Sequence, residues 1–296
     1  MAANQDESDA STRHEEFIDR LTLARIDRDI FTGSCHAGAP LRAFGGQVAA
    51  QALVAAGRTI EQDDRHVHSL HGYFLRPGRT DEPIVYLVER PRDGRSFSTR
   101  LVRAVQHGET IFTMSASFAV REPGPSHQVA MPLAPAPESL PQAQLPTASV
   151  NPELRQMGFP EERQLDLRLL DRETAEELTG GAASMIAWFR TTRPLPDDPL
   201  LQVCTLTYFS DITLAGTTLR SLGPDARDKF QLASLDHAMW FHDVFRADEW
   251  VLFVQDSTIA HGARSLARGQ FFSHDGVLVA SAVQEVLMRP RVVAGS

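Results

Sequence analysis

Four segments of the chain recur in the same order on both sides of a proline-rich stretch, and this repeat limits the possible folds more than any other feature. The segments are strand-like, and their spacing agrees to within a few residues between the copies. The first copy comprises residues 68–75, 83–89, 93–100 and 107–118, and the second comprises residues 233–240, 250–256, 261–268 and 274–284. Because chance rarely keeps four segments in register, we infer an internal duplication.

The stretch between the copies has an unusual composition. Half of the 18 prolines of the chain lie between residues 121 and 160. Proline has no N–H group to donate within a strand ladder or a helix interior, so regular structure is not expected there. We therefore predict a disordered tail at residues 1–14, a first unit at 15–121, a linker at 122–160 and a second unit at 161–291.

A helix is predicted near the start of each copy. Residues 46–56 are rich in alanine, contain no proline and follow a glycine, and their apolar residues recur at helical spacing. Residues 201–219 occupy the same place in the second copy. The threonines and aromatic residues in 203–209 would also permit a strand, and only the repeat favours a helix there. The predicted fold is α+β, with a helix wrapped by a curved antiparallel sheet in each of two tandem units.

Composition excludes several classes of protein. The chain has 29 basic and 38 acidic residues, a formal charge of −9 with no basic stripe, which argues against a nucleic-acid partner. No apolar run approaches the roughly 20 residues that span a bilayer. The first 16 residues are polar and acidic and do not resemble a secretory signal. We therefore expect a cytoplasmic protein with no membrane span.

Motifs for several kinds of catalysis are missing. The sequence contains no GxSxG elbow, Walker loop, GxGxxG or HExxH motif. His66 and His68 have a spacing that would suit a metal on one strand face, but no third ligand is evident. We interpret both as solvated or hydrogen-bonded strand histidines, with His68 as a general base the weaker alternative, and predict neither a metal nor a cofactor.

The second copy has polar side chains at three positions that the comparison of the copies places opposite Gly46, Ser69 and Ser117; these are Asp211, Ser234 and Gln284. Asp211 lies between aromatic and aliphatic residues, where a carboxylate is costly to bury without partners. Singly, Asp211 is also compatible with a surface or capping acid, Ser234 with a half-buried hydroxyl and Gln284 with a strand-edge amide. Together they favour a functional site in the second copy only.

The sequence resembles the acyl-CoA thioesterase II family over residues 21–289, nearly the whole chain. The motifs that carry the resemblance are FGGQV at 44–48, HS at 68–69, YFLRPG at 73–78, RDG at 92–94, DHAMWFH at 236–242, EW at 249–250, DGVLVAS at 275–281 and VQE at 283–285. Residues 151–194 match the family poorly.

The resemblance implies a double-hotdog fold and the hydrolysis of acyl-CoA to a free fatty acid and CoA. It also implies that an aspartate, a threonine and a glutamine position the attacking water. These roles fall on Asp211, Ser234 and Gln284. Ser234 stands where the family usually has threonine, so we expect a reduced rate or an altered preference without loss of activity.

Two alternatives to an acyl-CoA hydrolase remain open. A non-catalytic acyl-CoA or acyl-carrier binding protein would follow if Ser234 cannot replace threonine. A related hotdog dehydratase is less favoured, because the acid and histidine patterns of those families are absent. Exposed sheet edges favour pairing between chains, so we expect a homodimer or a dimer of dimers.

Overall fold

The computed structural model describes residues 17–35, 42–143, 165–181, 183–223 and 225–291. Strands in these ranges form a single 13-stranded sheet in the order β1-β2-β4-β5-β6-β3-β10-β13-β12-β11-β8-β7, and β9 also pairs with β13. The predicted tail at residues 1–14 lies outside the described residues. The predicted division into 15–121, 122–160 and 161–291 stays a prediction.

The elements of the two halves are as follows. The first half comprises β1 (Ala24–Asp27), β2 (Ile30–Gly33), α2 (Gly45–Gly57), β3 (Arg65–Phe74), β4 (Ile84–Asp93), β5 (Phe97–Gln106) and β6 (Glu109–Val120). The second half comprises β7 (Leu165–Leu169), α4 (Arg172–Thr179), β8 (Ser184–Thr191), α5 (Pro199–Thr217), η3 (Arg220–Leu222), α6 (Ala226–Lys229), β9 (Phe230–Ser234), β10 (Asp236–Phe241), β11 (Val251–His261), β12 (Arg264–Ser273) and β13 (Leu278–Pro290).

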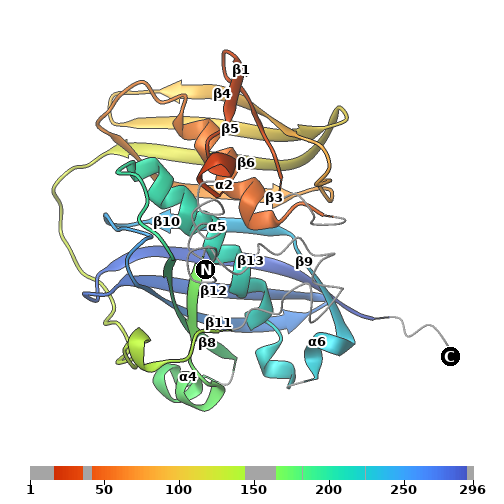
Figure 1. Cartoon of the computed structure of the whole chain (residues 1–296), viewed down its shortest axis with the longest axis vertical. Coiled ribbons are helices and arrows are strands. Elements are labelled where there is room, and N and C mark those ends of the chain that lie inside the picture. The colour runs from red at the N-terminus through yellow and green to blue at the C-terminus, as the bar shows by residue number, and fades with distance from the viewer. Residues whose placement is uncertain (1–16, 36–41, 144–164, 182, 224, 292–296) are drawn as a thin grey trace, which may run out of the picture.

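The strand order is the same in both halves when each is read from its outer edge to the centre of the sheet. The first half runs β1-β2-β4-β5-β6-β3, and the second runs β7-β8-β11-β12-β13-β10. The halves join where β3 pairs antiparallel with β10, for example at Gly72 and His237. Figure 1 shows the orange and yellow strands of the first half above the blue strands of the second. The inferred duplication is therefore confirmed.

Both predicted helices are present, and they lie against each other on one face of the sheet (Figure 1). Every residue of α2 from Gly46 to Ala56 is buried, as expected for a helix that is enclosed by its sheet and its partner helix. Residues 203–209 lie within the second helix, so the prediction from the repeat is confirmed and the local β propensity of these residues is overridden. In the described parts of the chain, no helix is long and apolar enough to cross a membrane.

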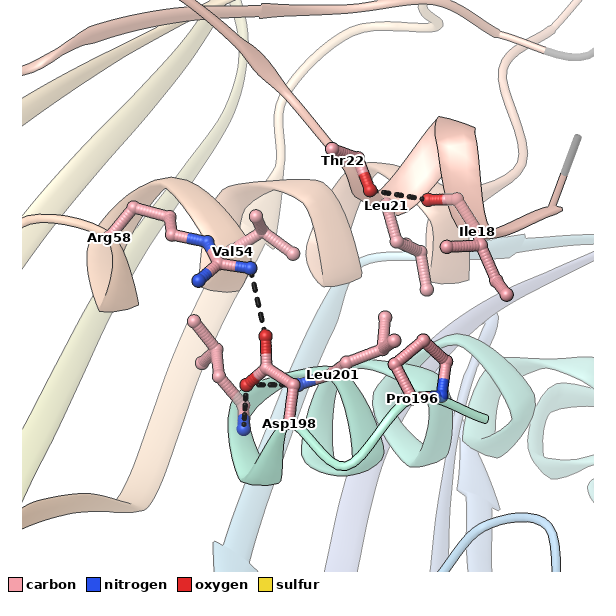
Figure 2. Close-up of a pocket in the computed structure, with 9 residues that line it drawn as sticks. Ile18, Leu21, Thr22, Val54, Arg58, Pro196, Asp198 and Leu201 are labelled. Carbon is pink, nitrogen blue, oxygen red and sulfur yellow. Dashed lines mark hydrogen bonds and ion pairs between the residues drawn. The ribbon is translucent and has the colours of Figure 1, made fainter. Parts of the chain in front are cut away.

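The first turn of α5 is capped by a residue that also links the two halves. Asp198 Oδ1 accepts hydrogen bonds from the Leu200 and Leu201 N–H groups, and Pro199 occupies the first helical position. The other carboxylate oxygen lies 2.9 Å from a guanidinium nitrogen of Arg58, just after α2. Figure 2 shows this ion pair beside a small cavity of about 160 Å³ between the helices.

The described part of the predicted linker, residues 122–143, is bound to the second half. It contains only the short 3-10 helix η1 (Pro137–Ser139) and no strand. The Gln128 side chain bonds to the backbone of β13 and its preceding turn, and Trp188 Nε1 donates to the Pro135 carbonyl at 2.9 Å. Met131, Ala134 and Leu140 pack on the tryptophan-containing core cluster beneath them. This segment therefore covers one face of the second half.

Candidate active site

Asp211 lies on α5 at the point where α5 crosses the start of α2. The side chain is 8% exposed, although it is charged and its helix is otherwise largely apolar. The crossing is close because α2 begins with two glycines. A Cβ atom on Gly46 would lie 2.4 Å from the Tyr208 carbonyl oxygen, and one on Gly45 would lie 2.7 Å from Asp211 Oδ2. The glycine pair therefore makes room for the carboxylate.

The three polar residues singled out in the second copy are in contact. Gln284 Nε2 donates to Asp211 Oδ1 at 2.6 Å, and Ser234 Oγ donates to the same oxygen at 3.3 Å. They come from three elements, α5, the end of β9 and the middle of β13. Gln284 Oε1 is buried and has no hydrogen-bond partner among the described residues.

The surroundings of Asp211 make its carboxylate more basic than an exposed one. Burial raises the pKa of Asp211 above the usual 3.8, because the charged form loses its hydration. His237, the Gln284 amide, the Gly46 backbone N–H and the Ser234 hydroxyl act in the opposite direction. The net shift in the pKa is upward, toward the range in which a carboxylate accepts protons well near neutral pH.

Asp211 and Ser234 line a cavity of about 530 Å³ between the two halves. One part of its wall is apolar, formed by aliphatic and aromatic side chains of α2, α5 and the strands of the first half. Its residues include Val48, Phe74, Ile111, Phe112, Ile212, Ala215 and Leu219. Gly45, at the first turn of α2, lies in the same wall. The cavity therefore joins a buried carboxylate, a helix N-terminus and an apolar surface.

A buried histidine that the sequence comparison did not select lies beside this group. His237 on β10 is 1% exposed, and its Nε2 lies 2.8 Å from the Ser210 hydroxyl. The Ser210 hydroxyl also lies 2.8 Å from the Thr207 carbonyl oxygen, to which it can donate. Burial lowers the pKa of His237, and Asp211 opposes that shift. The same offset that places Asp211 opposite Gly46 places His237 opposite Gly72, a contrast that was readable in the sequence.

His68, the weaker candidate for a general base, has a structural partner in the first half. His68 Nε2 lies 2.9 Å from Ser117 Oγ, and burial lowers the pKa of His68. It is on the first half and is not part of the cavity wall. Across the residues that the structure describes, no cluster of three or more histidine, cysteine or acidic side chains could hold a metal ion.

One alignment in the sequence comparison is wrong. Ser117 lies on β6, where the even-numbered side chains from 112 to 118 are the buried ones. Ser117 itself is half-buried and bonds to His68, whereas Gln284 is fully buried. The ladders give the correct alignment. Four residues beyond the aligned Ser69 and Ser234, Tyr73 pairs with Thr113 on β6, and Ala238 pairs with Val283 on β13. The next residues, Met114 and Gln284, are therefore the equivalent pair, and both are buried.

Two family models match the chain, one in each half. A model described as acyl-CoA thioesterase matches residues 159–287, and one described as acyl-CoA thioesterase N-terminal domain matches residues 34–119. The acyl-CoA thioesterase 2 of Haemophilus influenzae is 40% identical over 276 residues, which cover 92% of this chain and 96% of that protein. The chain belongs to the acyl-CoA thioesterase family.

Further family members and solved structures agree with this assignment. The mouse acyl-coenzyme A thioesterase 8 is 38% identical over 91% of this chain and 87% of its own length. The crystal structure of an acyl-CoA thioesterase II from Mycobacterium marinum superposes with a TM-score of 0.79 at 46% identity, covering 92% of this chain and 98% of that one. A protein from Alicyclobacillus acidocaldarius, described as having a hot dog fold, superposes with a TM-score of 0.75 at 24% identity, covering 94% of this chain and 99% of that one, and shows the fold alone. The predicted double-hotdog fold is confirmed.

Proposed function

We propose that this acyl-CoA thioesterase family member hydrolyses fatty acyl-CoA thioesters by direct attack of a water held by Asp211, Ser234 and Gln284. The observation that carries the proposal is the buried Asp211 carboxylate, which accepts hydrogen bonds from the other two side chains at the wall of a partly apolar cavity. A thioester carbonyl is electrophilic enough for an oriented water to attack it without a covalent intermediate.

Asp211 acts as the general base in this mechanism. It takes one proton from the water as the water oxygen bonds to the thioester carbonyl carbon. The tetrahedral intermediate then collapses, the C–S bond breaks, and the sulfur leaves with a proton returned from Asp211. The products are the carboxylic acid and the free CoA thiol. The upward shift of the Asp211 pKa increases the proton affinity of the carboxylate for this step.

The other groups orient the water and stabilise the developing charge. Gln284 and Ser234 both donate to Asp211 Oδ1 and so hold the carboxylate in the orientation that receives the water. The first turn of α2 faces the same cavity at Gly45, and its Phe44 cap supplies no side-chain acceptor for the backbone N–H groups. Those N–H groups are suited to stabilise the carbonyl oxygen as it becomes negative.

The test is the release of CoA thiol from a series of acyl-CoA esters of increasing chain length, with wild type and Asp211→Asn side by side. We expect Asp211→Asn to lower kcat by about a thousandfold, because it removes the base. Asp256→Asn is the matched control, since it removes the same charge from an exposed ion pair with Arg268. If wild type binds acyl-CoA but releases no thiol, the protein is an acyl-CoA binding protein and not a hydrolase.

For the cellular location and the assembly, the support comes from the sequence alone. We propose a cytoplasmic protein that forms a homodimer or a dimer of dimers through sheet edges. Cell fractionation checks the location, and light scattering at several concentrations checks the mass. A protein that is monomeric at micromolar concentration would contradict the second part.

A further inference from the structure

The cavity that contains Asp211 has a charged rim as well as an apolar wall. Four arginines line it, Arg42, Arg76, Arg227 and Arg291, and all four are exposed. Asp211, by contrast, is 8% exposed and is the only carboxylate among the described lining residues. The positive groups therefore occupy the solvent end of the cavity, and the buried carboxylate lies at its inner end.

The rim is assembled from both halves of the molecule. Arg42 precedes α2 and Arg76 follows β3, whereas Arg227 belongs to α6 and Arg291 follows β13. Arg227 reaches over α5 and lies near Gly216. A Cβ atom on Gly216 would lie 3.7 Å from Arg227 Nη2, which is an ordinary van der Waals distance. These four side chains converge although they are far apart in the chain.

Two of the four arginines have positive charges that no described side chain neutralises. Arg76 pairs with Glu109 at 2.9 Å, and Arg291 Nε donates to the Phe230 carbonyl. Arg42 and Arg227 make no ion pair within the part of the chain that the structure describes. The chain as a whole carries a formal charge of −9, so a local excess of guanidinium groups is unusual in this molecule. Such an excess attracts anions to the mouth of the cavity.

We propose that the four arginines form the binding site for the phosphate groups at the nucleotide end of the CoA substrate. This proposal rests on the proposed function and deepens it. Guanidinium groups bind phosphate oxygens in paired hydrogen bonds, and a substrate with an apolar tail and several phosphates matches a cavity with an apolar wall and a cationic mouth. The acyl chain occupies the apolar part, the thioester lies at Asp211, and the phosphates remain at the solvent end.

The experiment compares three thioesters of one fatty acid: the CoA ester, the 3′-dephospho-CoA ester and the pantetheine ester, which has no phosphate. The variant is Arg42→Ala with Arg227→Ala, which leaves the trio at Asp211 untouched. The matched control is Arg103→Ala with Arg268→Ala. It also removes two positive charges, from exposed strand positions outside the cavity.

We expect the rim variant to raise KM for the CoA ester by about tenfold, with kcat nearly unchanged. KM for the pantetheine ester should stay at its wild-type value, and the dephospho ester should fall between them. Raising the ionic strength should increase KM for the CoA ester in wild type more than in the rim variant. The control variant should behave as wild type throughout.

An unchanged KM for the CoA ester, or an equal rise for the pantetheine ester, would overturn the proposal. Faster use of an acyl-carrier-protein thioester, lost in the rim variant, would assign the arginines to a carrier protein instead. If wild type hydrolyses none of the esters, the proposed function fails separately. The rim is then tested by calorimetry with free CoA and 3′-dephospho-CoA, where the rim variant must bind CoA about tenfold more weakly than wild type.

Discussion

The two halves of the molecule share one strand order but differ where their helices cross. In the second half, Asp211 contacts Gln284 and Ser234 at the wall of a large cavity. In the first half, the ladder register makes Met114 the equivalent of Gln284, and the sequence comparison places Gly46 opposite Asp211. The same scaffold therefore carries buried polar groups on one side and an apolar replacement on the other.

The first half fills the corresponding region with its own polar side chains. Gln51 Nε2 donates to the Arg20 and Ser34 carbonyls, and the Tyr86 hydroxyl donates to Gln51 Oε1 at 2.6 Å. Phe17 is fully buried; it stacks on Phe209 of α5 and makes an edge-to-face contact with Tyr208. These groups bind each other, and no carboxylate is among them, so this cluster supports the fold without repeating the chemistry of Asp211.

Exchanging the equivalent residues of the two halves tests this difference, and the largest loss of kcat among these exchanges is expected from Gln284→Met. This variant places the first-half residue at the second-half position. The substitution keeps the volume but removes a buried hydrogen bond to the Asp211 carboxylate. Such a bond is worth about 1.5–3 kcal/mol, so we expect kcat to fall by roughly 10- to 100-fold. Thiol-release kinetics measure the loss, and circular dichroism checks the fold.

The reciprocal change is the control for that experiment. Met114→Gln buries an amide at a 2% exposed position without a designed partner. It should lower the free energy of unfolding by about 1–3 kcal/mol and leave kcat at its wild-type value. Equal losses of activity in both variants would mean that the two halves contribute alike to catalysis.

A smaller effect is expected from Gly45→Ala, because the added methyl would lie 2.7 Å from Asp211 Oδ2. The carboxylate must move away, and we expect kcat/KM to fall by about tenfold. Gly57→Ala at the other end of α2 is the matched control. Its methyl meets only side-chain atoms of Leu200, which can shift, so stability changes there but catalysis does not. A similar kinetic loss in both variants would attribute the effect to the helix as a whole.

Asp211→Asn should also make the protein more stable at neutral pH. Because burial raises the folded-state pKa of Asp211 above the usual 3.8, ionising it costs stability as the pH rises through that folded-state value. Asparagine removes this cost, and it still accepts the hydrogen bond from Gln284. We expect a Tm a few degrees above wild type at pH 7, and the difference should disappear below about pH 4. A lower Tm at pH 7 would contradict the raised pKa.

The fold could be predicted from the sequence because the repeat indicated the type of secondary structure where local propensity was ambiguous. Residues 203–209 favour a strand by composition, and only their place in the second copy predicted the α5 helix. The three polar residues of the second copy were also predictable, since each stands out in an apolar or small-residue setting. Their contacts at Asp211 depend on α5, β9 and β13 together.

Other parts of the site could not be predicted, for physical reasons. The alignment of Ser117 with Gln284 was displaced by an odd number of residues, which moves a side chain to the other face of a strand. Only the ladder register identifies Met114 as the equivalent residue. His237 stands opposite Gly72 at the same offset as Asp211 and Gly46, so that contrast was present in the sequence, but its burial and its contact with Ser210 depend on the packing of β10 against α5. The arginine rim joins four distant segments, so nothing in their spacing indicated it.

The smallest expected effect concerns Ser234, whose hydroxyl makes the longer of the two side-chain bonds to Asp211, 3.3 Å against 2.6 Å for Gln284. An O–H···O bond is strongest near 2.7–2.8 Å, so this hydroxyl holds the carboxylate weakly. Ser234→Thr adds a methyl that restricts the rotation of the side chain, and we expect kcat to rise about twofold to fivefold. Ser69→Thr, at the aligned position of the first half, should change nothing. Ser234→Ala completes the series, and we expect it to lower kcat by only about fivefold, because the bond that it removes is long. Wild-type kinetics in the alanine variant would remove Ser234 from the site and leave Asp211 and Gln284 as the pair that distinguishes the halves.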